Sequence, residues 1–189
     1  MLVYQVMLPK LSENHELIEL LKSGGIAVVR TDTLYGILAR ADNQLAVERV
    51  YEVKHRNPSK SCIILLDQPS SAYADGTELD ADVHRFHDIP TSFLVQSPNA
   101  PEWLLRQNTE LAYRVPANDE LQKLLVKTGP LIAPSANPES LQPAQTIAEA
   151  KAYFGDSIDM YVDGGTVPSD VQPSRLLRVH QDGTTERLR

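Results

Sequence analysis

The sequence predicts an α/β domain built on a mixed β-sheet. Short apolar runs that are typical of buried strands alternate along the chain with stretches of helical periodicity. The chain then closes with a hairpin pattern around Asp182-Gly183. Its 189 residues, 42% of them hydrophobic and 23% charged, are typical of one globular domain, which we expect to span residues 1–189.

Helices are predicted from the spacing of apolar residues and from the residues at the helix ends. Ser12 is the expected N-cap of the first helix, and Gly24 stops it. Thr146 begins the last helix, with Glu149 at the spacing of a capping box. The predicted helices span residues 12–23, 43–55, 80–88, 119–127 and 146–154.

Strands are predicted where apolar residues run together between turn-forming residues. The clearest is Ile26-Ala27-Val28-Val29, which two glycines precede. Cys62 begins the next strand and is expected to be buried there. The predicted strands span residues 26–29, 62–66, 92–96, 111–115, 131–133, 160–162 and the hairpin pair 176–180 and 186–188.

Composition excludes several classes of protein. The net charge is −7, from 18 basic and 25 acidic residues, which disfavours a general nucleic-acid binder. A single cysteine excludes an intramolecular disulfide framework. No apolar run is long enough to cross a membrane, and the N-terminus lacks the pattern of a secretory signal. We therefore expect a cytoplasmic protein without a membrane partner.

Polar residues follow the first predicted strand. The segment Arg30-Thr31-Asp32-Thr33-Leu34-Tyr35-Gly36 places hydroxyls, a carboxylate and a phenol where ligands of α/β proteins usually bind. A turn that satisfies its own backbone explains the same residues equally well.

Cations gather at the end of the second predicted helix. Lys54, Arg56 and Lys60 fall within seven residues, and such a group can hold a polyphosphate. Cations at a helix C-terminus also stabilise the helix dipole, by about 0.3–1 kcal/mol each, without any ligand. Taken alone, this segment favours the dipole explanation.

Two loops add further polar residues. Ser135 and Asn137 lie two residues apart after a short strand, and Ser174 follows the glycine pair of Asp163-Gly164-Gly165 at some distance. Each segment is also compatible with an ordinary turn.

The order of these segments is more specific than any one of them. Together they resemble the YrdC-like family, which includes threonylcarbamoyl-AMP synthases and carries a conserved Lys-x-Arg and Ser-x-Asn tetrad. The matching segments are Thr31-Asp32-Thr33-Leu34-Tyr35-Gly36, Lys54-His55-Arg56, Leu111-Ala112-Tyr113-Arg114-Val115-Pro116, Ser135-Ala136-Asn137, Pro173-Ser174 and the final Arg187-Leu188-Arg189.

The resemblance implies a fold and a reaction. The fold is a single twisted mixed-sheet domain of the YrdC-like, dsRNA-binding-like type with a concave active-site cleft. The reaction converts L-threonine, bicarbonate and ATP to L-threonylcarbamoyladenylate and pyrophosphate. The product feeds N6-threonylcarbamoyl modification of tRNA, so tRNA is an indirect partner, reached through downstream transferase proteins. Mg²⁺ is expected with ATP, and no metal ligand is assigned to the chain.

The resemblance also implies roles for ten residues. The expected catalytic residues are Lys54, Arg56, Ser135 and Asn137. The expected ATP-binding residues are Arg56, Lys60, Ser135 and Arg189. The expected threonine-binding residues are Thr33, Arg114, Ala133 and Ser174.

Departures from the family pattern leave two alternatives open. Arg30 and Asn57 stand where the family has proline, Arg175 where it has threonine, and Glu139-Ser140 where Ser-Gly is frequent. One alternative is a non-catalytic RNA-binding paralogue of the YrdC/YciO type. The other is a carbamoyl-transfer module that accepts carbamoyl-phosphate.

Overall fold

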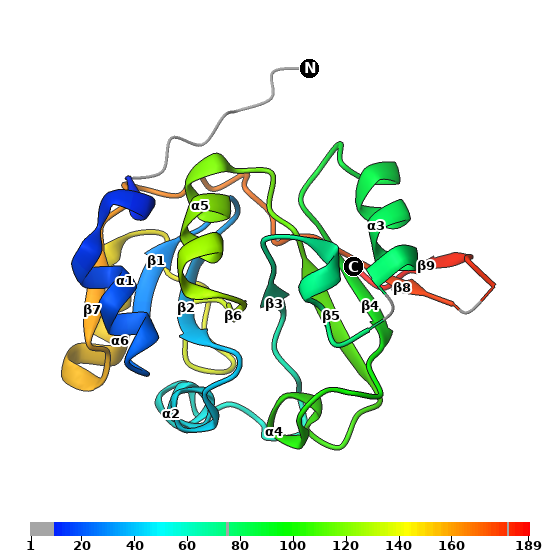
Figure 1. Cartoon of the computed structure of the whole chain (residues 1–189). Coiled ribbons are helices and arrows are strands. Elements are labelled where there is room, and N and C mark those ends of the chain that lie inside the picture. Colours follow the sequence, from blue (N-terminus) through cyan, green and yellow to red (C-terminus); the bar gives the residue numbers. More distant parts are fainter. Residues whose placement is uncertain (1–9, 75, 181) are drawn as a thin grey trace.

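The computed structural model describes residues 10–74, 76–180 and 182–189. Within these residues nine strands form one mixed sheet in the order β7-β1-β2-β6-β3-β5-β4-β8-β9 (Figure 1). The predicted α/β fold with a mixed sheet is therefore confirmed. The strands are β1 Ala27–Arg30, β2 Tyr35–Arg40, β3 Ile64–Leu65, β4 Thr91–Gln96, β5 Glu110–Arg114, β6 Leu131–Ile132, β7 Met160–Val162, β8 Arg175–Val179 and β9 Thr185–Arg187.

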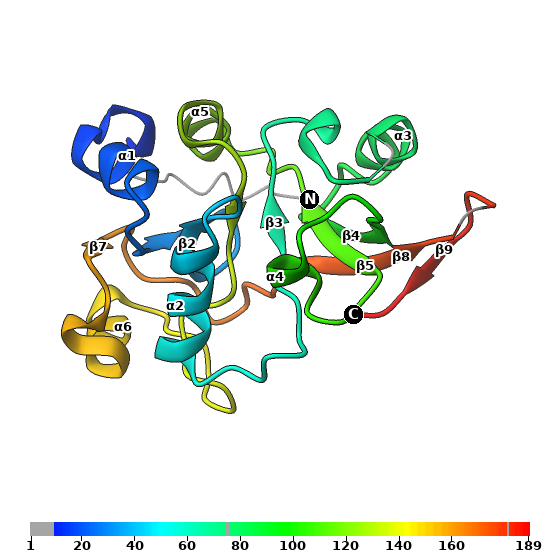
Figure 2. The same cartoon turned by 60° about the horizontal axis from the view of Figure 1, so that its bottom comes forward.

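Helices cover both faces of this sheet. Figure 2 shows α1, α5 and α3 along one side and α2 and α6 on the other. On the first side, leucines of α1 and α5, such as Leu17 and Leu125, pack with Val29 and Leu38 of the sheet. The α-helices are α1 His15–Lys22, α2 Gln44–Lys54, α3 Gly76–Arg85, α4 Glu102–Leu105, α5 Asp119–Thr128 and α6 Ile147–Phe154.

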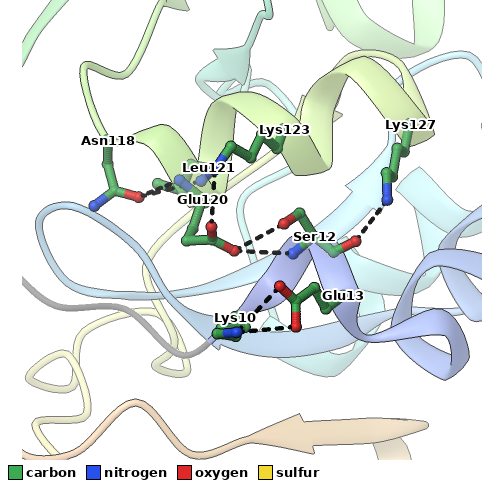
Figure 3. A network of polar contacts seen from close by, with 8 residues as sticks. All are labelled: Lys10, Ser12, Glu13, Asn118, Glu120, Leu121, Lys123 and Lys127. Carbon is green, nitrogen blue, oxygen red and sulfur yellow. Dashed lines mark hydrogen bonds and ion pairs between the residues drawn. The ribbon is translucent and has the colours of Figure 1, made fainter.

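The first helix begins later than its sequence pattern predicts. Residues 11–13 form a 3-10 turn, and α1 begins at His15 with Asn14, not Ser12, as its N-cap. Ser12 instead donates from its backbone N–H and its hydroxyl to Glu120 at 3.2 and 2.9 Å, while Lys127 donates to its carbonyl at 2.7 Å (Figure 3). Ser12, the expected cap of α1, therefore connects the 3-10 turn before α1 to α5.

Strand β2 was not predicted from the sequence. It runs antiparallel to β1, with Arg30 paired to Tyr35, so only residues 31–34 form the turn between them. Residues 35–39 are all buried because both faces of the sheet are covered here. The strand begins with Tyr35 and Gly36, which belong to the polar segment 30–36, and glycine is disfavoured in strands, so the sequence indicates a turn here.

The short helix α4 was also not predicted. The indole of Trp103 in α4 donates to the carbonyl of Ala41 at 3.1 Å, and its ring packs against the core. Trp103 therefore packs α4 against the core. In the described part of the chain, no helix has the length and apolar character needed to cross a membrane.

The paired strands β4 and β5 form one wall of the candidate site. Along β4 and β5, Phe93 and Tyr113 point into the core, and their neighbours Leu94 and Ala112 line a cavity on the other face. The polar segments predicted from the sequence lie in loops around this cavity.

Candidate active site

One cavity of about 760 Å³ gathers residues from all the segments that the sequence singled out. Its lining comes from the β1–β2 turn, the loop after α2, the end of β5, the loop after β6 and the chain around β8. Eight of the ten predicted site residues line it: Thr33, Arg56, Lys60, Arg114, Ala133, Ser135, Ser174 and Arg189. Lys54 and Asn137 lie outside this lining.

Hydrogen bonds between Thr31 and Thr33 hold the conformation of the β1–β2 turn. The Thr31 hydroxyl donates to the carbonyl of Leu34 at 2.7 Å and accepts from the backbone N–H of Thr33 at 3.2 Å. The two hydroxyl oxygens are 3.1 Å apart, and Arg114 Nη1 donates to Thr33 Oγ1 at 3.2 Å. The Thr33 hydroxyl is thereby fixed at the cavity wall.

Two guanidinium groups give this end of the cavity a positive charge. Arg114, only 4% exposed, lies 3.2 Å from the carboxylate of Asp32, and among the described residues its Nε has no hydrogen-bond partner. Arg189 donates to the carbonyl of Ser174 at 3.1 and 3.0 Å. Partial burial and the nearby charge of Arg114 lower the pKa of Arg189. Two cations facing one carboxylate favour binding of an anion here.

The hydroxyl of Ser174 is held on the same wall. It lies 2.9 Å from the hydroxyl of Ser92, which is fully buried in β4. Ser92 pairs with Leu176 on the neighbouring strand β8, and Leu176 lines the cavity. The loop that precedes β8 therefore presents a fixed hydroxyl close to the two arginines.

The loop after α2 presents Arg56 to the cavity. The helix ends at Lys54 because His55 adopts the left-handed conformation, with φ of 49°. Arg56 then donates from Nε to the carbonyl of Lys60 at 3.2 Å and from Nη2 to that of Ser61 at 3.0 Å. The remaining N–H groups of this guanidinium are not used in these contacts.

Tyr51 supports this loop from below. Its hydroxyl donates to the carbonyl of Lys60 at 2.7 Å and accepts from the thiol of Cys62 at 3.4 Å. Cys62 is buried as predicted, and its side chain belongs to both the core and the cavity wall. The guanidinium of Arg106 stacks on the Tyr51 ring at 3.8 Å. The carbonyl of Lys60 is therefore held by two donors, Tyr51 and Arg56.

Lys54, for which the resemblance implies a catalytic role, lies outside the cavity lining. It is 2% exposed, and its ammonium donates to the backbone carbonyls of Ser135 and Asn137. Burial, followed by the nearby charge of Arg56, lowers the pKa of Lys54 to about 8. Because His55 is left-handed, Lys54 and Arg56 point to different surroundings. The two hydrogen bonds of Lys54 hold the Ser-x-Asn loop in place.

Asn137 also lies behind the cavity wall. Its Oδ1 accepts from the hydroxyl of Ser135 at 2.6 Å, and its Nδ2 donates to the carbonyl of Leu141 at 2.8 Å. Asn137 therefore orients Ser135, and Ser135 alone of this pair lines the cavity.

The glycine pair serves the fold rather than the cavity. Tyr35 donates to the carbonyl of Gly165 at 2.8 Å and accepts from the N–H of Gly164 at 2.9 Å. Arg30 donates to the carbonyl of Gly164 at 2.7 Å, and a Cβ at Gly164 would lie 2.4 Å from the Cβ of Arg30. Glycine is needed here because the Arg30 side chain passes so close.

Sequence reasoning missed the far end of the cavity. Residues 107–110 and Arg178 line it, and Asn108 donates to the carbonyl of Ser59 at 2.9 Å. Nothing in their local pattern distinguishes these residues from an ordinary loop. The pairing of β5 with β4 and of β4 with β8 brings the strands of Glu110 and Arg178 together, and Asn108 reaches the loop of Arg56 through Ser59.

Comparisons with known proteins show which family this chain resembles. The Sua5/YciO/YrdC family model, described as "Telomere recombination", matches residues 19–189. The chain is 32% identical over 164 residues to a threonylcarbamoyl-AMP synthase of Pseudoalteromonas translucida. The aligned region covers 80% of this chain and 88% of the relative. It is 29% identical over 170 residues to a threonylcarbamoyl-AMP synthase of Marinobacter nauticus. That aligned region covers 83% of this chain and 86% of the relative.

Solved structures share the fold. P. abyssi Sua5 complexed with L-threonine matches 91% of this chain with a TM-score of 0.79 and 24% identity, and this chain spans about half (52%) of that protein. E. coli YciO matches with a TM-score of 0.76 and 20% identity over 92% of this chain and 86% of that one. With a family model that matches nearly its whole length and a relative that shares almost a third of its aligned residues, the chain belongs to the Sua5/YciO/YrdC family.

Proposed function

We propose that this protein is a threonylcarbamoyl-AMP synthase that makes L-threonylcarbamoyladenylate and pyrophosphate from L-threonine, bicarbonate and ATP. The observation that carries the proposal is the shared cavity, in which Arg56, Lys60 and Ser135 lie on the same lining as Thr33 and Arg114. The synthases of Pseudoalteromonas and Marinobacter lend it support through their names.

The arginine end of the cavity is the proposed amino-acid site. Arg114 pairs with the carboxylate of threonine through the N–H groups that Asp32 and Thr33 leave open. Thr33, Ala133 and Ser174 surround the amino acid. The L-threonine complex of P. abyssi Sua5 supports a site for this amino acid within the fold.

The loop after α2 is the proposed phosphate site. Arg56 offers a planar guanidinium that two backbone carbonyls already orient, and Lys60 offers a point charge. Ser135 contacts the nucleotide from the opposite loop, and Arg189 contacts it from beside the amino acid. Lys54 and Asn137 act as positioning residues for Ser135.

The proposed chemistry joins two anions. The amine of threonine adds to the carbon of bicarbonate, water leaves, and a carbamate forms. A carbamate oxygen then attacks the α-phosphorus of ATP, a new O–P bond forms, and the bond to the β-phosphate oxygen breaks to release pyrophosphate. Because both reactants are negative, the protein's contribution is charge neutralisation and alignment.

Mg²⁺ would enter this site with ATP. Among the described residues no group of three or more His, Cys, Asp and Glu side chains could hold a metal ion by itself. Mg²⁺ commonly binds through substrate phosphates and water instead, where it neutralises phosphate charge. The residues present therefore fit a metal that arrives as MgATP, and the cytoplasm, which supplies ATP and tRNA, is the expected compartment.

Product formation tests the proposal. Purified protein is incubated with MgATP, L-threonine and bicarbonate, and pyrophosphate and the adenylate are measured by coupled assay and mass spectrometry. We expect both products, with neither formed when threonine or bicarbonate is omitted. Absence of the adenylate would overturn the proposal, and carbamoyl-phosphate-dependent pyrophosphate release or salt-sensitive RNA binding would point to the two alternative functions.

A further inference from the structure

A carboxylate outside the cavity lining connects two loops. Glu139 accepts a hydrogen bond from the backbone N–H of Asn57 and lies 2.6 Å from the ammonium of Lys60. Its own backbone N–H donates to the carbonyl of Lys54 at 2.9 Å. The loop of Ser135 and the loop of Arg56 are therefore joined through one side chain.

The two partners of this ion pair have different surroundings. The Lys60 side chain is 59% exposed and lines the cavity, whereas Glu139 is 28% exposed and does not line it. The ammonium of Lys60, followed by the N–H of Asn57, lowers the pKa of Glu139. Glu139 is thus a fixed negative charge directly behind a cation of the cavity.

The backbone around Lys60 does not depend on this pair. Tyr51 and Arg56 hold the carbonyl of Lys60, and Asn108 holds the carbonyl of Ser59. The Lys60 side chain can consequently change partner while its loop stays in place. A half-exposed ion pair is also weak enough to be exchanged for a ligand with several negative charges.

We propose that Glu139 is a positioning residue that competes with polyphosphate for Lys60. Without a bound polyphosphate, Glu139 holds the ammonium of Lys60. A bound polyphosphate takes the ammonium over, and Lys60 returns to Glu139 when the polyphosphate leaves. The inference deepens the proposed function, in which pyrophosphate is the polyphosphate that must be released.

Calorimetric titration with inorganic tripolyphosphate at low ionic strength tests this competition. Glu139→Gln keeps an oxygen that can accept from Asn57 but removes the charge that holds Lys60. We expect this variant to bind tripolyphosphate about two- to fivefold more tightly than the natural chain, the range that exposed ion pairs produce. Thermal melting checks that both proteins are folded.

Two further variants separate competition for Lys60 from a general charge effect. In a Lys60→Met background, Glu139→Gln should bring less than half of its gain, because the contested cation is gone. Glu16→Gln makes the same charge change on an exposed position of α1, outside the cavity lining, and should leave binding unchanged.

The proposal is overturned if Glu139→Gln binds equally or more weakly, if its full gain persists without Lys60, or if Glu16→Gln gives the same gain. Failure to detect tripolyphosphate binding in any variant also overturns it. Adenylate formation by the natural chain is measured separately, so failure of the competition leaves the proposed function standing. A natural chain that shows the competition but makes no adenylate would overturn the function alone.

Discussion

The buried ammonium of Lys54, in the last turn of α2, donates a hydrogen bond to the backbone carbonyl of Asn137. A second bond from the same ammonium reaches the carbonyl of Ser135. A cation that chain position alone would assign to a phosphate is thus part of the scaffold that holds the Ser-x-Asn loop. Lys54 is therefore a positioning residue, whereas Ser135, which lines the cavity, is a proposed ligand contact.

Replacement of Lys54 is expected to reduce stability as well as turnover. Lys54→Met leaves the partly buried carbonyls of Ser135 and Asn137 without this donor, which costs about 1–3 kcal/mol. Denaturant unfolding measures this cost, and the matched change Lys151→Met, at an exposed position of α6, should have almost no effect. Full stability of Lys54→Met together with lost turnover would contradict the scaffold role.

The same lysine gives stability a pH dependence. Its pKa is about 8 in the folded chain against an ordinary value of 10.5, so between these values the unfolded chain binds more protons. The free energy of unfolding should therefore rise between about pH 8 and 10.5, by roughly 3 kcal/mol at most, and show no contribution from this group below pH 7.

Unfolding midpoints measured from pH 7 to pH 10.5 test this dependence. The natural chain should gain stability relative to Lys54→Met over the upper part of that range. Parallel curves for the two proteins would show that Lys54 carries its proton at its ordinary pKa.

Tyr51 is expected to act through Arg56. Tyr51→Phe removes the hydroxyl that holds the carbonyl of Lys60 but keeps the ring on which Arg106 stacks. We expect kcat/KM for ATP to fall about threefold to tenfold, as the loss of one hydrogen bond predicts, with the KM for threonine unchanged.

A second tyrosine supplies the control for this change. The Tyr161 hydroxyl donates to the carbonyl of Gly155 at 2.7 Å, away from the cavity lining. Tyr161→Phe loses a comparable bond and should leave both KM values as they are. Equal effects of the two changes would exclude a positioning role for Tyr51.

Arg114 is expected to determine the threonine requirement. Arg114→Ala removes a buried cation that contacts Thr33 and pairs with Asp32. The KM for threonine should rise about tenfold or more, as for a lost charge-assisted bond, and more than the KM for ATP. Initial rates over a matrix of both substrates give the two values. A larger rise for ATP would move Arg114 to the nucleotide.

Helices and the general fold could be predicted because local patterns determine them. The apolar spacing of Leu121, Leu124 and Leu125 indicates α5, and these leucines are buried as expected. Strand β2 escaped prediction because its first residues, Tyr35 and Gly36, continue a polar segment that is typical of a turn. The capping role assigned to Ser12 failed because its contact with Glu120 lies over a hundred residues away in sequence.

The sequence predicts most of the cavity lining but not the direction in which each side chain points. Family motifs indicated Thr33, Arg56 and Arg114, and all three line the cavity. No sequence pattern shows that Lys54 turns into the protein while Arg56, two residues later, turns toward the cavity. That difference follows from the left-handed residue His55 and from two carbonyls on a distant loop.

Calorimetric titration with MgATP determines whether the cavity beside Arg56 is the proposed nucleotide site. We predict that the natural chain binds MgATP and that Arg56→Ala binds it at least tenfold more weakly, because a charge-assisted contact is lost. Lys22→Ala, an equal charge change outside this cavity, should bind as the natural chain does. Equal affinity in Arg56→Ala and the natural chain would contradict the account.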